Sequence, residues 1–151
     1  MEINTITISP ELDKEAISSI CNSSYSNKEL IVYGNTPLMT MNYCLLGKSN
    51  KCYNGCTHNC NKEDSFYLKD RMGFKFRVLP DNIQSITTIF NSKTTSISSR
   101  DFNIDFARID ILDESMDEIN NIINTVKSNN RLEGKEYTNA NLNREIWTKK
   151  R

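Results

Sequence analysis

The sequence predicts an α/β protein with a parallel sheet. Strand-like and helix-like segments alternate over the first 34 residues, two aromatic-rich strands flank a turn near the middle, and a helix-like apolar pattern follows residue 115. Alternation of strands with helices is typical of βαβ units, whose strands run parallel. At 151 residues, a single domain is the expectation.

The first unit of this pattern covers residues 1–43. A β-branched run at residues 3–8 predicts a strand, which Ser9-Pro10 ends. Pro10 suits the first helical position after a Ser9 cap, and a second apolar run at residues 29–33 predicts the next strand, interrupted by Gly34 and Pro37. The predicted helix between them has one apolar face, which consists of Leu12, Ala16, Ile17, Ile20 and Cys21.

A cysteine-rich segment, residues 44–64, follows and shows no periodicity. It contains four of the five cysteines in the spacing C-x7-C-x3-C-x3-C, namely Cys44, Cys52, Cys56 and Cys60. Four thiolates in one segment can bind Zn²⁺ tetrahedrally or hold an iron–sulfur cluster, and the spacing does not choose between these metals. Incidental thiols in a loop are the alternative. A cysteine nucleophile would need the only histidine, His58, as its base, and we give that reading less weight.

Residues 65–127 predict a hairpin, further strands and a helix. The turn at residues 69–73 separates two aromatic-rich strands, residues 66–68 and 74–78, which is the pattern of a β-hairpin. Residues 86–90 and 106–112 read as strands, the second of them buried.

The helix of this region begins at a predicted capping box formed by Ser115 and Glu118. Its apolar stripe consists of Met116, Ile119, Ile122, Ile123 and Val126. The tail, residues 128–151, is weakly patterned and contains the single Trp147.

Charge and composition exclude several classes of protein. The 19 basic and 19 acidic side chains cancel, so the chain lacks the basic excess of a free-standing nucleic-acid clamp. Its apolar runs are too short to cross a bilayer, and the N-terminus lacks the pattern of a secretory signal. Clustered cysteines without a signal favour metal chemistry in a reducing compartment over disulfides. We therefore expect a cytoplasmic protein with no membrane partner.

Several short motifs, in order along the chain, resemble the peptidase U32 family, the collagenase-like proteases. They are I-T-I-S-P-E-L at 6–12, E-L-I-V-Y-G-N-T-P-L-M at 29–39 with Tyr43-Cys44, Y-L-K-D-R at 67–71, T-T-I-F-N-S at 87–92 and A-R-I-D-I-L-D-E-S at 107–115. The family signature E-x-F-x2-G followed by two cysteines is matched at Glu29, Gly34 and Cys44. Ile31 replaces the Phe and Pro37 replaces the first cysteine, and a further family cysteine falls on Ser85.

The resemblance implies the second part of a parallel α/β barrel-like domain, so the expected fold is a partial barrel with an inserted hairpin and a metal loop. Because the earlier strands are missing, we expect a fragment that associates with the absent half of the barrel, with a second subunit or as a homo-oligomer. In several members of the family such cysteines hold a [4Fe–4S] cluster. With the signature cysteine lost at Pro37, Cys52, Cys56 and Cys60 are expected to complete the ligand set with Cys44.

Two classes of function follow from the resemblance. The family name implies a peptidase with a protein or peptide substrate, although the sequence shows no complete catalytic constellation. Other members hydroxylate RNA bases or a quinone precursor, and for these the chain would be a structural, metal-binding part. Polar residues at the carboxyl ends of barrel strands face the active site. The candidates are Tyr33, Asn91, Arg108 and Asp110. The competing interpretations are a core tyrosine for Tyr33, a turn cap for Asn91 and an ion pair for Arg108 and Asp110.

Overall fold

The computed structural model describes residues 3–23, 25–47, 52, 66–81, 83–84 and 86–143. It is a mixed α/β fold with two sheets and few helices, as the sequence predicts at the level of fold class. The chain divides into two compact units: residues 1–34 together with 93–151, and residues 35–92. Within the described ranges, neither sheet closes into a barrel.

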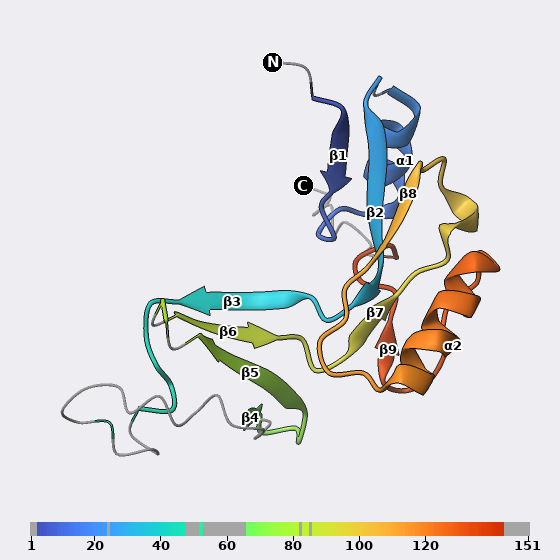
Figure 1. Cartoon of the computed structure of the whole chain (residues 1–151). Coiled ribbons are helices and arrows are strands. Elements are labelled where there is room, and N and C mark those ends of the chain that lie inside the picture. Colours follow the sequence, from blue (N-terminus) through green and yellow to red (C-terminus); the bar gives the residue numbers. More distant parts are fainter. Residues whose placement is uncertain are drawn as a thin grey trace, which may run out of the picture. The chain divides into compact units, whose positions relative to one another are not determined.

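The first unit begins with the predicted βαβ arrangement (Figure 1). Strand β1 (Thr5–Ile8) pairs in parallel with β2 (Asn27–Gly34), and α1 (Lys14–Ser23) connects them. The predicted cap is wrong by one turn. Residues 9–12 form a turn closed by the bond from Leu12 N to Ser9 O at 3.3 Å, and α1 starts after Asp13. Asp13 is the better cap because its Oδ1 accepts the N–H of Ala16 at 2.8 Å.

A hydrophobic core lies between this sheet and α1. It consists of Ile8, Ile17, Cys21, Leu30, Val32, Ile97 and Phe102. Leu30 and Val32 are each 1% exposed, and burial of one such side chain contributes about 1.5–3 kcal/mol. Cys21 belongs to this buried helical face, as predicted, and its burial raises the pKa of the thiol.

Three further strands complete the sheet of the first unit. Strand β8 (Phe106–Ile109) pairs in parallel with β2, β7 (Thr94–Ser96) pairs antiparallel with the end of β2, and β9 (Tyr137–Thr138) adds to β7. The sequence predicts a buried strand over residues 106–112, whereas β8 ends at Ile109. Phe106 is instead 49% exposed, and of the four residues of β8 only Ile109 packs against the core.

The predicted capping box at the start of α2 (Met116–Lys127) is present. Ile122 is buried and Val126 packs against the core, while Met116 is 70% exposed. Met116, the first residue of α2, therefore does not belong to the buried stripe. A short 3₁₀ helix, η2 (Ser99–Asp101), follows β7.

The second unit contains a four-stranded antiparallel sheet in the order β3–β6–β5–β4. Its strands are β3 (Pro37–Met41), β4 (Phe66–Lys69), β5 (Lys75–Asp81) and β6 (Ile86–Phe90). The predicted hairpin is confirmed as β4 and β5, and Gly73, with φ 90°, supplies the left-handed residue in its turn. Neither helix in the described part of the chain has the length and apolar character needed to span a membrane.

Candidate functional site

Backbone hydrogen bonds to Gly47 link the two cysteines of the predicted metal segment that the structure describes. The N–H of Gly47 donates to the carbonyl of Cys44 at 3.3 Å, and the N–H of Cys52 donates to the carbonyl of Gly47 at 2.8 Å. Both bonds involve the backbone of Gly47, which therefore links Cys44 to Cys52. Both thiols are half-buried and neither is in a disulfide. The backbones of two of the four predicted ligands are therefore each hydrogen-bonded to Gly47.

The other two predicted ligands, Cys56 and Cys60, lie outside the described residues, as do His58, Ser85 and Trp147. Among the residues that are described, no group of three or more histidine, cysteine or acidic side chains is close enough to hold a metal ion. The donor set suits a thiolate metal, because soft sulfur ligands select zinc or iron–sulfur clusters.

The register of the second sheet shows what the cysteine segment connects. Met41, at the end of β3, pairs with Thr87, which pairs with Pro80, and Phe66, at the start of β4, pairs with Val78. The last residue of β3 and the first residue of β4 therefore lie at the same end of the sheet, although these two strands are its opposite edges. Four strands place these edges about 14 Å apart. The cysteine segment joins the two edge strands of this sheet.

Tyr33 lies at the carboxyl end of β2 and is only 5% exposed. Its hydroxyl donates to Glu114 Oε1 at 3.0 Å, while Glu114 Oε2 accepts the N–H groups of Leu112 at 2.7 Å and Asp113 at 3.1 Å. Burial, followed by the hydrogen bond to Glu114, raises the pKa of Tyr33. This tyrosine is a neutral donor with a satisfied hydroxyl, which matches the core interpretation.

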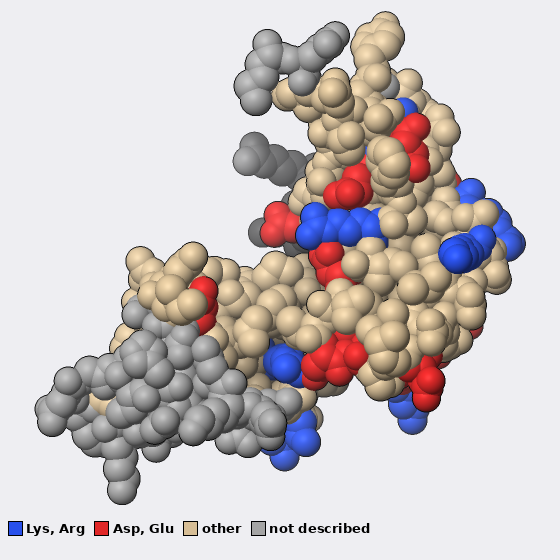
Figure 2. Space-filling model, viewed as in Figure 1, with Lys and Arg blue, Asp and Glu red and all other residues tan. Residues whose placement is uncertain are grey.

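Arg108 and Asp110 form the ion pair that the sequence left as an alternative. Arg108 Nε lies 2.6 Å from Asp110 Oδ1, and a guanidinium nitrogen lies 3.6 Å from Glu29 Oε1. Thr7 donates to the same Glu29 oxygen at 2.8 Å. Asp110, with Glu29, raises the pKa of Arg108. Thr7, Glu29 and Arg108 thus form a polar row across β1, β2 and β8, and Asp110 follows directly after β8. Figure 2 shows that basic and acidic side chains both occur on the face turned to the viewer.

Gly34 lets the residue after β8 approach the end of β2. A Cβ atom at Gly34, whose φ is 141°, would lie 2.8 Å from the Cβ and carbonyl oxygen of Asp110. The N–H of Asp110 donates to the carbonyl of Tyr33 at 2.9 Å. Because Gly34 has no side chain, Asp110 can come close enough to bond to the backbone of Tyr33.

Asn91 belongs to the second unit, whereas the other three candidates belong to the first. Its N–H donates to the carbonyl of Thr36 at 2.9 Å, and its carbonyl accepts Asn35 Nδ2 at 3.5 Å. These contacts fit the alternative role of Asn91, which is to hold a turn. The structure therefore gathers Tyr33, Arg108 and Asp110 around one strand end and places Asn91 in the other unit.

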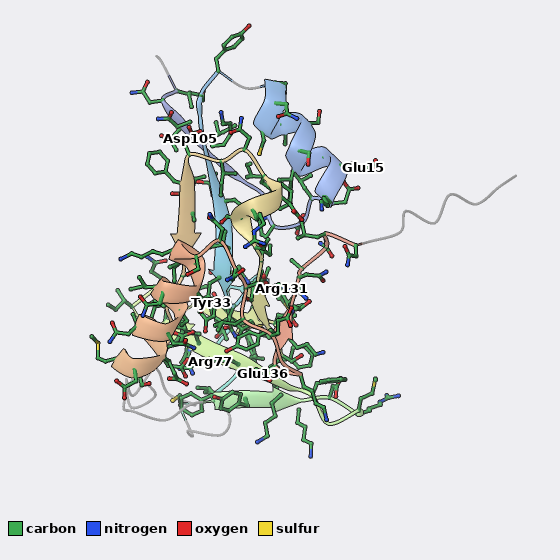
Figure 3. All side chains as sticks on the ribbon, turned by 90° about the vertical axis from the view of Figure 1, so that its right-hand side faces the viewer. Glu15, Tyr33, Arg77, Asp105, Arg131 and Glu136 are labelled. Carbon is green, nitrogen blue, oxygen red and sulfur yellow. The ribbon has the colours of Figure 1, made fainter. Side chains whose placement is uncertain are left out.

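The sequence did not indicate a polar cleft of about 360 Å³ in the first unit. It is lined by Ser96, Arg131, Leu132, Glu133, Gly134, Tyr137, Thr138 and Asn139. Arg131 also borders a second cleft of about 200 Å³, and its guanidinium is held by Glu133 Oε1 at 3.0 Å. Figure 3 shows Arg131, Glu136 and Tyr33 in this part of the first unit. Apart from Ser96 of β7, the lining comes from the tail segment, whose weak pattern gave no signal in the sequence.

The fold and these sites define a mixed α/β protein with two sheets and a thiol-bearing turn. Comparison with protein-family models, with curated proteins and with solved structures finds no match to this chain.

Proposed function

We propose that the chain is the metal-binding part of a larger U32-type enzyme, in which Cys44, Cys52, Cys56 and Cys60 hold one metal centre. The observation that carries this proposal is the turn that connects Cys44 to Cys52 through Gly47 with two backbone hydrogen bonds. It ties the backbones of two half-buried cysteines to the same glycine, and the remaining two cysteines follow within eight residues of Cys52. Four protein thiolates complete a closed site.

The parallel arrangement of β1, β2 and β8 supports the wider part of the proposal, a partial barrel completed by an absent half or a second subunit. β1 and β8 each pair only with β2 in the described sheet, so their outer edges can accept further strands. A cytoplasmic location is part of the proposal, and the free thiols of the described cysteines, Cys21, Cys44 and Cys52, support it because reducing compartments keep cysteines out of disulfides.

The metal would be a [4Fe–4S] cluster or Zn²⁺. A cluster would supply electron transfer, which suits a part in the hydroxylation of an RNA base or a quinone precursor, whereas Zn²⁺ would be structural. Hydrolysis of a peptide is the alternative that the family name suggests. We favour it less, because Tyr33 donates to Glu114 and Arg108 is paired with Asp110, so neither is poised as a nucleophile or base.

The test is to purify the full chain without oxygen and to measure metal, sulfide and the visible spectrum together. Absorption near 400 nm with about four irons and four sulfides per chain identifies a cluster. A colourless protein with about one zinc identifies a structural site. A chain with neither metal contradicts the proposal.

The ligand set is tested by substitution. Cys52→Ser should remove the metal, since a three-thiolate site loses affinity. Cys21→Ala is the control, because Cys21 is buried in the core of the first unit and is not one of the proposed ligands. This variant should retain its full metal content. Metal loss in Cys21→Ala but not in Cys52→Ser would overturn the assignment.

A further inference from the structure

Charge is divided unequally between the two units of this neutral chain. Residues 35–92 contain seven Lys and Arg against four Asp and Glu, a formal charge of +3. Because the whole chain is neutral, the other unit carries −3. The twelve residues 66–77, which contain β4 and the start of β5, hold four of the basic residues and one acidic residue. The neutral total therefore hides a local basic segment.

The strand register places these cations on one face of the sheet. Tyr67 pairs with Arg77, and Lys69 pairs with Lys75. Cross-strand partners share a face, and so do residues two apart in a strand. These four residues, which we name the basic hairpin face, therefore lie together. Tyr67 is 50% exposed and both lysines are exposed, whereas Arg77, labelled in Figure 3, is half-buried.

Lys69 and Lys75 face each other directly, an arrangement that destabilises a sheet. Asp70, the one acidic residue within residues 66–77, is engaged elsewhere: its Oδ1 accepts the N–H of Met72 at 2.9 Å and that of Phe74 at 2.8 Å. None of the ion pairs between described residues includes either lysine. A bound polyanion would relieve this repulsion.

An aromatic side chain accompanies these cations, and the surface continues along the sheet. Leu79 pairs with Thr88, which pairs with Thr40, so these three side chains extend the same face. Leu79 is 42% exposed and Thr40 is also exposed. A flat, open strand surface with cations around an aromatic ring matches the two requirements of a single-stranded nucleic acid, namely phosphate neutralisation and base stacking.

We propose that the basic hairpin face binds single-stranded nucleic acid. The lysines and Arg77 contact phosphates, and Tyr67 stacks on a base. This role is separate from the metal centre and does not depend on it.

The test is fluorescence anisotropy of a labelled 12-nucleotide oligo-uridine and of oligo-thymidine, with the full chain, at 50 and 200 mM salt. Contacts to three or four phosphates should weaken binding about 20- to 50-fold between these salt concentrations. Lys69→Gln/Lys75→Gln should weaken binding at 50 mM and reduce the slope of log K against log salt by about 1.4. Tyr67→Ala should weaken binding about five-fold or more, with the salt slope unchanged.

Lys127→Gln/Lys135→Gln removes two exposed lysines of the first unit and is the charge-matched control. Its affinity should equal that of the unchanged chain, and circular dichroism of each variant checks that it folds. Equal loss in both double variants would overturn the proposal, as would equal affinity for a duplex of the same length. Binding to phosphatidylserine vesicles but to neither oligonucleotide would assign the surface to a bilayer instead, with exposed Met72 at its tip.

Discussion

At the residue scale, Tyr33 shows how one side chain connects the sheet to the segment before α2. The phenol ring is buried with the end of β2, and its hydroxyl reaches the Glu114 carboxylate, which also accepts two N–H groups of its own loop. A half-buried carboxylate gains from such donors, because a charge without partners is costly to remove from water. The tyrosine was predicted as a candidate from its position, but its partner, 81 residues later, is a consequence of the fold alone.

Tyr33→Phe should destabilise the protein without changing its metal content. The variant keeps the ring and removes the donor, and a hydrogen bond to a charged group contributes about 1.5–3 kcal/mol. Urea denaturation at pH 7 should show a loss of this size. Tyr43→Phe, at a side chain that is 64% exposed, is the control and should leave the free energy of unfolding unchanged.

The same pair predicts a pH dependence. Burial and Glu114 raise the pKa of Tyr33, so folding favours the neutral phenol. This stabilisation is complete below the ordinary tyrosine pKa of about 10 and is lost as pH rises toward the folded value. The unchanged chain should therefore lose stability above about pH 10, and Tyr33→Phe should lose less. Parallel alkaline curves for the two proteins would contradict this.

At the scale of elements, the sequence predicted correctly those strands and helices whose formation depends on neighbouring residues. The first βαβ unit and the hairpin carry clear periodicity and turn residues, so both are present in the structure. Strand β3 was missed because it begins with Pro37, which reads as a break but is tolerated on an edge strand. Strands β7 and β9 were missed because three and two residues are too few to show a period.

The capping box of α2 is a local prediction that can be measured. Ser115 Oγ accepts the N–H of Glu118 at 3.4 Å, and Glu118 Oε2 accepts the N–H and hydroxyl of Ser115, each at 2.7 Å. Ser115→Ala should lower the free energy of unfolding by about 1 kcal/mol in urea denaturation. Ser128→Ala, at the other end of α2, removes only a hydroxyl bond to the carbonyl of Asn124 and should cost less.

The cap also has a pH signature. Hydrogen bonds from Ser115 lower the pKa of Glu118, so the folded state favours the carboxylate. This contribution is present above the ordinary glutamate pKa of about 4.3 and is lost as pH falls through the lower folded value. Ser115→Ala should therefore flatten the acid side of the stability curve. An unchanged acid limb would show that the box does not hold Glu118.

At the scale of the whole molecule, the sequence indicated candidate functional residues, such as the cysteines, better than it indicated which distant segments lie together in the fold. The cysteine spacing is visible in the chain, and two of those cysteines are hydrogen-bonded through their backbones to the same residue, Gly47. The division of charge between units could not be seen, because the second unit is defined by strand pairing between segments far apart in the chain. The polar cleft at Arg131 was also hidden, since the tail is held by contacts to residues far away in the chain, such as the pairing of β9 with β7 and the packing of Leu142 against the core.

Removing the proposed metal should loosen the second unit and leave the first unchanged. The cysteine segment belongs to residues 42–65, which join the edge strands β3 and β4, so a metal held there would close the connection between the two edges. Structural metal binding is coupled to folding, because the site does not persist in the unfolded chain. The first unit has its own core, which includes Leu30 and Val32 and contains none of the proposed ligands.

Hydrogen exchange of the full chain, before and after treatment with a chelator under anaerobic conditions, measures both units at once. Amides of β4 and β5 should exchange about ten-fold faster or more after metal removal, a change that corresponds to a local loss of about 1.4 kcal/mol. Amides of β2 should keep their rates. Cys52→Ser should reproduce the effect without chelator, and Cys21→Ala should not. Equal acceleration in β2 and β5 would mean that the units do not unfold separately, and unchanged rates in β5 would mean that the metal does not stabilise this sheet.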